Sequence, residues 1–136
     1  MYIRQKLGVL FRGRDGRARI EAYNTQTPAL GFELQTVLPE RAGDPLLQAA
    51  LFYRMLQLNY DAVIIYPEGE SNLAPLIRSA EGEVLILDVG AKTRPSLIPD
   101  APCYHALPLE TDRSIGEEVR YVLSELSRLL ERPLRA

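Results

Sequence analysis

The sequence predicts a single α/β domain built on a mixed sheet, and three observations support this class. Two short runs, residues 62–66 and 83–89, are apolar on both faces, as are strands in the covered middle of a parallel sheet. The segment between them, residues 71–81, is long enough for a helical crossover, so the two strands should lie side by side and run the same way. Three strand-like segments precede them in close succession, which predicts an antiparallel three-strand meander.

The predicted meander lies in the N-terminal part of the chain. Residues 2–11 carry enough β-forming residues for a first strand, and Asp15-Gly16 is a dipeptide typical of a two-residue hairpin turn. Residues 20–24 would complete the second strand of that hairpin. Residues 31–38 alternate apolar and polar side chains, which is typical of a half-buried third strand.

Helix signals follow the meander and the two buried strands. Asp44-Pro45 places an N-cap residue before a proline at the first helical position, and an apolar stripe continues beyond it. A short strand is expected at residues 103–107. Ser114 and Glu117 then form a capping box that opens a terminal amphipathic helix. Helices separated in this way can cover both faces of a sheet.

The composition is that of an ordinary globular domain and excludes several classes of protein. The length of 136 residues is typical of one domain, which would comprise residues 1–136. Hydrophobic residues make up 46% of the chain and charged residues 25%, with a net charge of −2, which is typical of a folded globular protein. Neither a membrane-spanning apolar run nor a signal sequence is apparent, so we expect a cytoplasmic protein without membrane contact. The single cysteine, Cys103, and the single histidine, His105, can form neither a disulfide nor a Cys/His zinc site.

The predicted hairpin would place four arginines together. With Asp15-Gly16 as the turn, the two-residue period of a strand puts these side chains on one face of the ribbon, here named the arginine face: Arg12, Arg14, Arg17 and Arg19. Six basic residues against one acidic residue give the first 19 residues a local charge of +5. This asymmetry favours contact with an anionic ligand or with nucleic acid.

The order of the predicted elements resembles the ribonuclease H-like topology, which would cover nearly the whole chain. The resemblance implies metal-holding acidic residues on the first strand, on the first helix and at the end of the fourth strand. Residues 2–11 and 45–58 contain no Asp or Glu, so only Glu68 and Glu70 remain at the last of these places. The resemblance therefore implies the fold without two-metal chemistry.

A second pattern resembles the RecB-like nucleases of the restriction-endonuclease superfamily. Those nucleases place an Asp on one strand, a Glu-x-Lys on the next and a Gln-x-x-x-Tyr on the following helix, where the carboxylates hold Mg²⁺. Gln35 stands where that family has the lysine that helps to orient the attacking water. The corresponding residues are Asp15, Glu33-Leu34-Gln35, and Gln48 with Phe52 or Tyr53.

Charged side chains also follow the two buried strands. Glu68 and Glu70 come after the first, and Asp88 and Lys92 lie at the end of the second. Because the carboxyl ends of parallel strands meet at one edge of a sheet, the three acids could converge on Mg²⁺, with Lys92 meeting an anionic substrate. Alternatively, residues 67–70 form a solvated turn in which Glu70 favours the start of the next helix through the helix dipole.

Two hypotheses of function, from different classes, follow from these patterns. The favoured one is a non-enzymatic cytoplasmic binding module without a cofactor, a homodimer through the meander edge or the terminal helix, whose arginine face contacts an anionic ligand or nucleic acid. The alternative is a Mg²⁺- or Mn²⁺-dependent hydrolase or degenerate nuclease. Its site would use Glu68, Glu70, Asp88 and Lys92, or Asp15 and Glu33.

Overall fold

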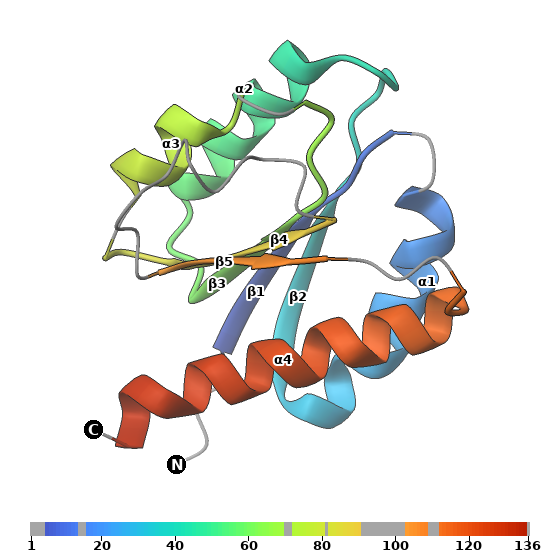
Figure 1. Cartoon of the computed structure of the whole chain (residues 1–136), viewed down its shortest axis with the longest axis vertical. Helices are drawn as coiled ribbons and strands as arrows, with labels where there is room; N and C mark the ends of the chain where they lie inside the picture. Colours follow the sequence, from blue (N-terminus) through green and yellow to red (C-terminus); the bar gives the residue numbers. More distant parts are fainter. Residues whose placement is uncertain are drawn as a thin grey trace.

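The structure, a computed structural model, is a layered α/β domain (Figure 1). It describes residues 5–13, 16–69, 72–80, 82–90, 103–108 and 112–135, with the backbone alone for 131–135. Its strands are β1 (Gln5–Leu10), β2 (Phe32–Val37), β3 (Ala62–Ile65), β4 (Leu85–Val89) and β5 (Tyr104–Leu107). Its helices are α1 (Gly16–Gln26), α2 (Pro45–Leu56), α3 (Ala74–Ser79) and α4 (Ile115–Arg135), with a short 3₁₀ helix η1 (Pro28–Leu30).

The strands form one sheet in the order β2-β1-β3-β4-β5, and every neighbouring pair is parallel. The first strand in the sequence is therefore internal, with Leu7 opposite Leu34 of β2 on one side and Ala62 of β3 on the other. Helices α1 and α4 cover one face of the sheet, and α2 and α3 cover the other (Figure 1). This arrangement is a doubly wound sheet with the strand order 2-1-3-4-5.

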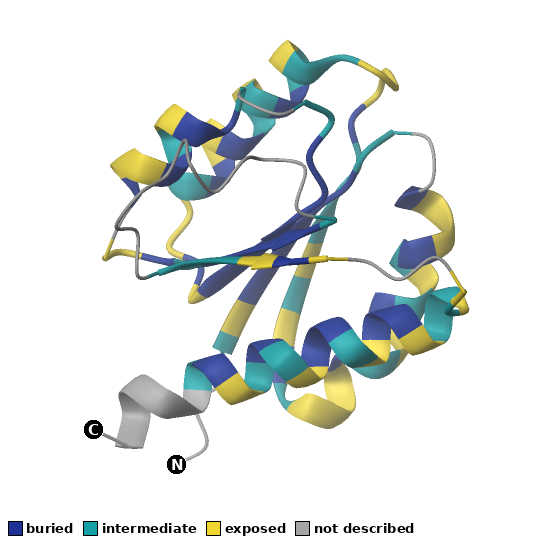
Figure 2. Ribbon diagram, in the orientation of Figure 1, coloured by how far each residue is buried: buried dark blue, intermediate teal, exposed yellow. Residues whose placement is uncertain are grey.

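Each face of the sheet has its own apolar core, because β1 and β3 are buried on both sides (Figure 2). Under α1 and α4, the sheet residues Leu7, Val9 and Ile64 pack with Val119 and Val122 of α4. Under α2 and α3, the core is formed by Leu10, Phe52, Met55, Val63, Ile65, Ile77 and Ile86. The continuous apolar runs in the sequence thus reflect burial in the middle layer.

The prediction of two parallel buried strands is confirmed, since β3 and β4 are neighbours with Ile64 opposite Leu87. The expected start of α2 is also confirmed, because the Asp44 side chain accepts a hydrogen bond from the backbone N–H of Leu47 at 3.0 Å. The capping box opens α4, where Ser114 Oγ accepts from the N–H of Glu117 at 3.2 Å. No helix in the described part of the chain is long and apolar enough to cross a bilayer.

The predicted antiparallel meander is wrong. Residues 20–24, expected as a strand, lie in α1, and β2 runs parallel to β1. Because α1 carries the chain back across the sheet, the next strand enters in the same direction as β1, as a crossover connection requires. Buried Gly16, Arg19 and Tyr23 recur at intervals of three and four residues, which is the period of a helix packed on one face.

The ribonuclease H-like element order fails for the same reason. That expectation needed three antiparallel strands at the start of the chain, and the structure has strand, helix and strand over residues 5–37. An all-parallel sheet with β1 inside it also has no meander edge. The expected homodimer contact through a meander edge is therefore wrong.

Gly8 lies at a point of close packing in β1. A Cβ atom there would lie 2.8 Å from Met55 Cε and 3.1 Å from Tyr60 Cζ. The missing side chain allows α2 and the Tyr60 ring to approach the sheet closely. A side chain at position 8 would have to displace the Met55 methyl and the Tyr60 ring, which favours glycine here although glycine is a weak strand former.

We expect Gly8→Ala to lower the free energy of unfolding by about 1–3 kcal/mol, because the added methyl overpacks the core beneath α2. Urea denaturation measures this change. Gly116→Ala is the matched control, since a Cβ on Gly116 in α4 meets no atom within 4 Å. Alanine there should stabilise the helix by about 0.5–1 kcal/mol, and a loss of stability as large as that of Gly8→Ala would contradict the packing argument.

Candidate ligand-binding site

The strand order places a topological switch point between β1 and β3. The chain leaves β1 for α1 on one face of the sheet and leaves β3 for α3 on the opposite face (Figure 1). Where the connections of adjacent strands diverge in this way, open α/β sheets form a crevice at the carboxyl edge that binds ligands. The residues that follow these two strands are therefore the first candidates for a site.

Gln48 of α2 joins the two strands at this point. Its Nε2 donates to the carbonyl oxygens of Phe11 and Tyr66, at 3.1 and 2.8 Å, and its Oε1 accepts from the N–H of Glu68 at 2.8 Å. The side chain is 1% exposed. One buried amide thus satisfies three backbone groups that follow strand ends and would otherwise be buried without partners.

A second contact holds the two connections together. The N–H of Gly13, after β1, donates to Glu68 Oε1, after β3, at 3.1 Å. Glycine is needed at position 13 because a Cβ would lie 2.7 Å from the Cα of Ala42. Arg12, partly buried, immediately precedes this glycine. The carboxyl edge is therefore a braced structure with a guanidinium and a carboxylate at its border.

Beneath this edge, on the α1 and α4 face, lies a buried polar cluster. Arg19 of α1 donates to Glu118 of α4 through Nε and Nη2, at 2.5 and 2.8 Å, and both residues are less than 10% exposed. The Tyr23 and Tyr66 hydroxyls lie 2.7 Å apart, and Tyr66 donates to Glu118 at 3.5 Å. Burial raises the pKa of both tyrosines above 10. These groups satisfy one another, so the cluster positions α1 and Tyr66 and is closed to a ligand.

On the α2 and α3 face of β4, Asp88 is fully buried. Its Oδ2 accepts a hydrogen bond from the Tyr104 hydroxyl of β5 at 2.5 Å. Burial raises the pKa of Tyr104, and the hydrogen bond to Asp88 and the negative charge of that carboxylate raise it further. The pair therefore links the two strands on that face through a charge-assisted hydrogen bond.

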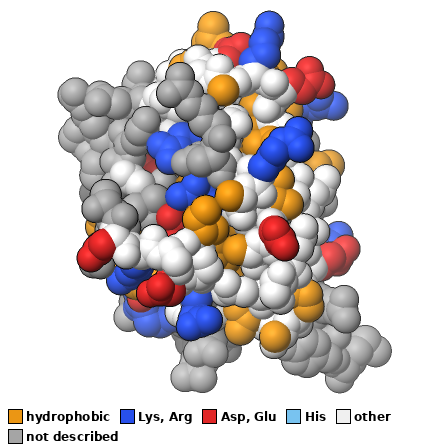
Figure 3. All heavy atoms as spheres, turned by 90° about the vertical axis from the view of Figure 1, so that its right-hand side faces the viewer, with side chains coloured by type: hydrophobic (Ala, Val, Ile, Leu, Met, Phe, Trp, Pro, Cys, Tyr) orange, Lys and Arg blue, Asp and Glu red, His pale blue; other side chains and the backbone are white. Residues whose placement is uncertain are grey.

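The arginine face is not present as predicted. Arg17 is exposed on α1, whereas Arg19 is buried against Glu118, and Arg12 lies before the helix. Arg14 lies outside the described residues. Side chains two residues apart diverge on a helix instead of sharing one side, which separates Arg17 from Arg19. The side of the molecule at the carboxyl edge shows basic and acidic side chains interspersed (Figure 3).

The predicted strand-end acids are placed only in part. Glu68 lies at the carboxyl edge and Asp88 is buried one strand further along, while Glu70 and Lys92 lie outside the described residues. Within the described ranges, no group of three or more His, Cys, Asp or Glu side chains is arranged to hold a metal ion. The Mg²⁺ site of Glu68, Glu70 and Asp88 with Lys92 therefore stays a prediction, because two of its four residues lie outside the described ranges.

The RecB-like pattern is dispersed by the fold. Glu33 and Gln35 lie on β2, with Glu33 opposite Lys6 near the amino ends of the strands, whereas Gln48 braces the carboxyl edge. Phe52 is buried in the core, and Tyr53 is 55% exposed. Asp15 lies outside the described residues.

Sequence reasoning did not identify the bracing role of Gln48 or the Tyr104 contact with Asp88. A signal for Gln48 exists, since it shares the inward face of α2 with Phe52 and Met55 and is polar. A polar residue inside an apolar stripe indicates a buried hydrogen-bonding role. Searches against models of known protein families and against curated proteins find no match to the chain.

We expect Gln48→Met to lower the free energy of unfolding by about 2 kcal/mol, because two carbonyls and one N–H lose their buried partner. Urea denaturation measures the loss, and hydrogen exchange should become faster at the Glu68 amide. Gln57→Met, at an exposed position just after α2, is the matched control and should change stability little. Equal stability of the two variants would argue against the bracing role.

The raised pKa values predict a loss of stability in alkaline solution. The unfolded chain releases tyrosine protons near pH 10, while folded Tyr66 and Tyr104 retain theirs, so the stabilising contribution is complete below about pH 10 and is lost as the pH rises further. Unfolding free energies measured from pH 7 to 11 should show this decline. The unfolding free energy should fall less steeply with pH in Tyr104→Phe than in the exposed control Tyr53→Phe. Identical slopes in the two variants would contradict the role of the Tyr104 pKa.

Proposed function

We propose that this protein is a binding module that takes a small anionic ligand at the carboxyl edge of its sheet, beside Arg12, Gly13 and Glu68. The observation that carries the proposal is the divergence of the β1 and β3 connections at a point braced by Gln48. Ligands of open α/β sheets bind at such points. Bracing keeps the backbone around the crevice in place before a ligand arrives, which lowers the ordering cost of binding.

The charges at this edge favour an anion. Arg12 supplies a partly buried guanidinium, and the eleven-residue helix α1 begins at Gly16, so the positive end of its dipole lies at the same edge. Glu68 already accepts the Gly13 N–H, which reduces its repulsion of an incoming anion. A hydroxyl group of the ligand could donate to the same carboxylate.

A small ligand fits these observations better than nucleic acid. A nucleic-acid backbone requires a patch or stripe of basic side chains. Arg19 is buried in an ion pair, and acidic side chains lie among the basic ones on the exposed side (Figure 3). We therefore propose that a single anionic group binds at Arg12, and not an extended nucleic-acid strand.

The remaining expectations stay predictions. The predicted homodimer contact at a meander edge is withdrawn, because the outer strands of the parallel sheet are β2 and β5. A homodimer through the terminal helix α4 stays a proposal. The cytoplasmic location and the metal-dependent hydrolase are kept as proposals. Glu68 accepts a hydrogen bond from the Gly13 N–H and Asp88 accepts one from the Tyr104 hydroxyl, so both carboxylates already have structural partners.

Titration with inorganic phosphate, followed by amide chemical shifts in NMR spectra, tests the proposal. Shifts should concentrate at Gly13, Gly16 and Glu68, and Arg12→Gln should weaken the affinity by about tenfold because a charge-assisted hydrogen bond is lost. Arg54→Gln, exposed on α2, is the matched control and should bind as the unaltered protein does. Unchanged affinity in Arg12→Gln, or shifts located elsewhere, would contradict this function.

A further inference from the structure

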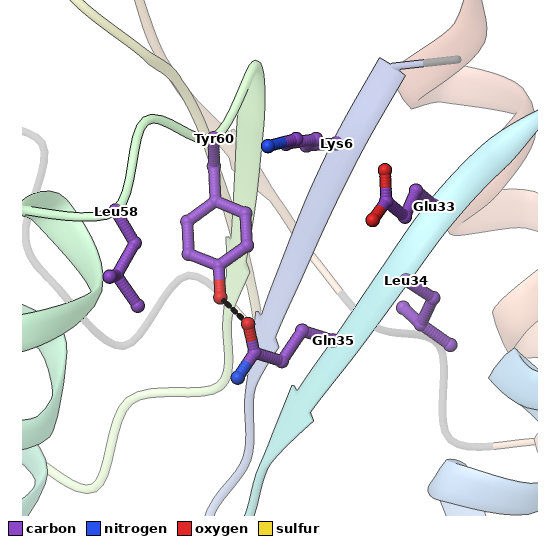
Figure 4. Close-up of a pocket in the computed structure, with 6 residues that line it drawn as sticks. All are labelled: Lys6, Glu33, Leu34, Gln35, Leu58 and Tyr60. Atoms are coloured by element: carbon purple, nitrogen blue, oxygen red, sulfur yellow. Dashed lines mark hydrogen bonds between the residues drawn. The ribbon is translucent and has the colours of Figure 1, made fainter.

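A hollow of about 320 Å³ lies at the other end of the sheet, near the amino ends of β1 and β2 (Figure 4). It opens on the face covered by α2 and α3. Its volume is at the lower end of the range for small-molecule sites in proteins. The residues that line it are Lys6, Glu33, Leu34, Gln35, Leu58 and Tyr60.

The sheet register brings opposite charges together in this hollow. Lys6 of β1 and Glu33 of β2 are opposite one another on neighbouring parallel strands, which run about 4.8 Å apart. Gln35 is two residues further along β2 and so shares the face with Glu33. The three polar side chains therefore come from two rigid strands and not from loops.

These polar groups are available to a ligand. None of the ion pairs or side-chain hydrogen bonds of the described residues uses the Lys6 ammonium or the Glu33 carboxylate. Lys6 extends towards Tyr60 in Figure 4 instead of towards Glu33. Gln35 accepts a hydrogen bond from the Tyr60 hydroxyl through Oε1, which leaves its Nε2 able to donate. An ammonium, a carboxylate and an amide donor thus border one cavity without being paired with each other.

The remaining wall of the hollow is apolar. Leu58, which is 53% exposed, contributes an apolar side chain to this wall. The ring of Tyr60 lies between Leu58 and Lys6 and is held in place by the close approach to Gly8 and by the bond to Gln35 (Figure 4). An apolar group in the hollow would cover Leu58 and one side of this ring, and their removal from water favours binding.

We propose that this hollow binds a free α-amino acid with an apolar side chain. The ligand carboxylate would pair with Lys6, and its ammonium group would pair with Glu33. The apolar side chain would lie against Leu58 and Tyr60. A ligand with both charges satisfies the two opposite charges of the hollow at once, which a simple anion or cation cannot do. The proposal does not depend on the anion site, because that site lies at the opposite edge of the sheet.

L-phenylalanine, 3-phenylpropionate and phenethylamine form a matched set of probes, since the second lacks the ammonium group and the third lacks the carboxylate. NMR titration should give shifts at Lys6, Glu33 and Tyr60 with L-phenylalanine. Both analogues should bind about three- to tenfold more weakly, as expected for the loss of one partly exposed charge pair. Absence of shifts at about 10 mM L-phenylalanine, which corresponds to an affinity too weak to be specific, would overturn the proposal.

Two variants assign the charges. Lys6→Gln should remove the preference for L-phenylalanine over phenethylamine, and Glu33→Gln should remove the preference over 3-phenylpropionate, because each variant deletes the partner of one ligand charge. Both positions are exposed, so the fold should tolerate the changes. Arg17→Gln and Glu40→Gln are exposed controls that should retain both preferences. Preferences that persist in Lys6→Gln and Glu33→Gln would refute the assignment.

Discussion

The spacing of β1 and β3 at their carboxyl ends is the constraint on which the rest of the structure depends. These two strands are buried on both faces, and the helices that follow them lie on opposite sides of the sheet. The Gln48 amide spans the two chains just where they separate. Because this amide belongs to α2, it also fixes the start of that helix relative to the sheet. One side chain thus links the helix layer to the carboxyl ends of β1 and β3.

The parts of the fold that depend on local chemistry could be predicted from the sequence. The strands β3 and β4 follow from their apolar runs, and Asp44 and Ser114 cap their helices with their own side chains. The segment Gly16–Gln26 could not be predicted in this way. The spacing of its arginines is equally compatible with one face of a β-hairpin. Its helical state depends on a distant partner, because Arg19 pairs with Glu118, which is 99 residues away in the sequence.

The candidate site shows the same division. The convergence of strand ends at one edge follows from two parallel strands, and Glu68 is found there. The partners of the charged groups do not follow, because no local pattern links Asp88 to Tyr104 or Glu68 to the backbone of Gly13. The hollow at the other edge could not be predicted either, since it requires Lys6 and Glu33 to be opposite one another, and the antiparallel arrangement expected from the sequence gives no such register.

The internal place of β1 has a consequence for how the chain acquires its structure during synthesis. A ribosome releases β1 before either of its neighbours, so the strand has one neighbour at most until residues 62–65 have emerged. Contacts between segments so distant form slowly. The guanidinium of Arg19 remains hydrated for longer still, because Glu118 is translated 99 residues later. The packing of α4 on the sheet beside α1 is therefore a late event. Nascent chains that do not yet include α4 expose an apolar surface that a chaperone can recognise.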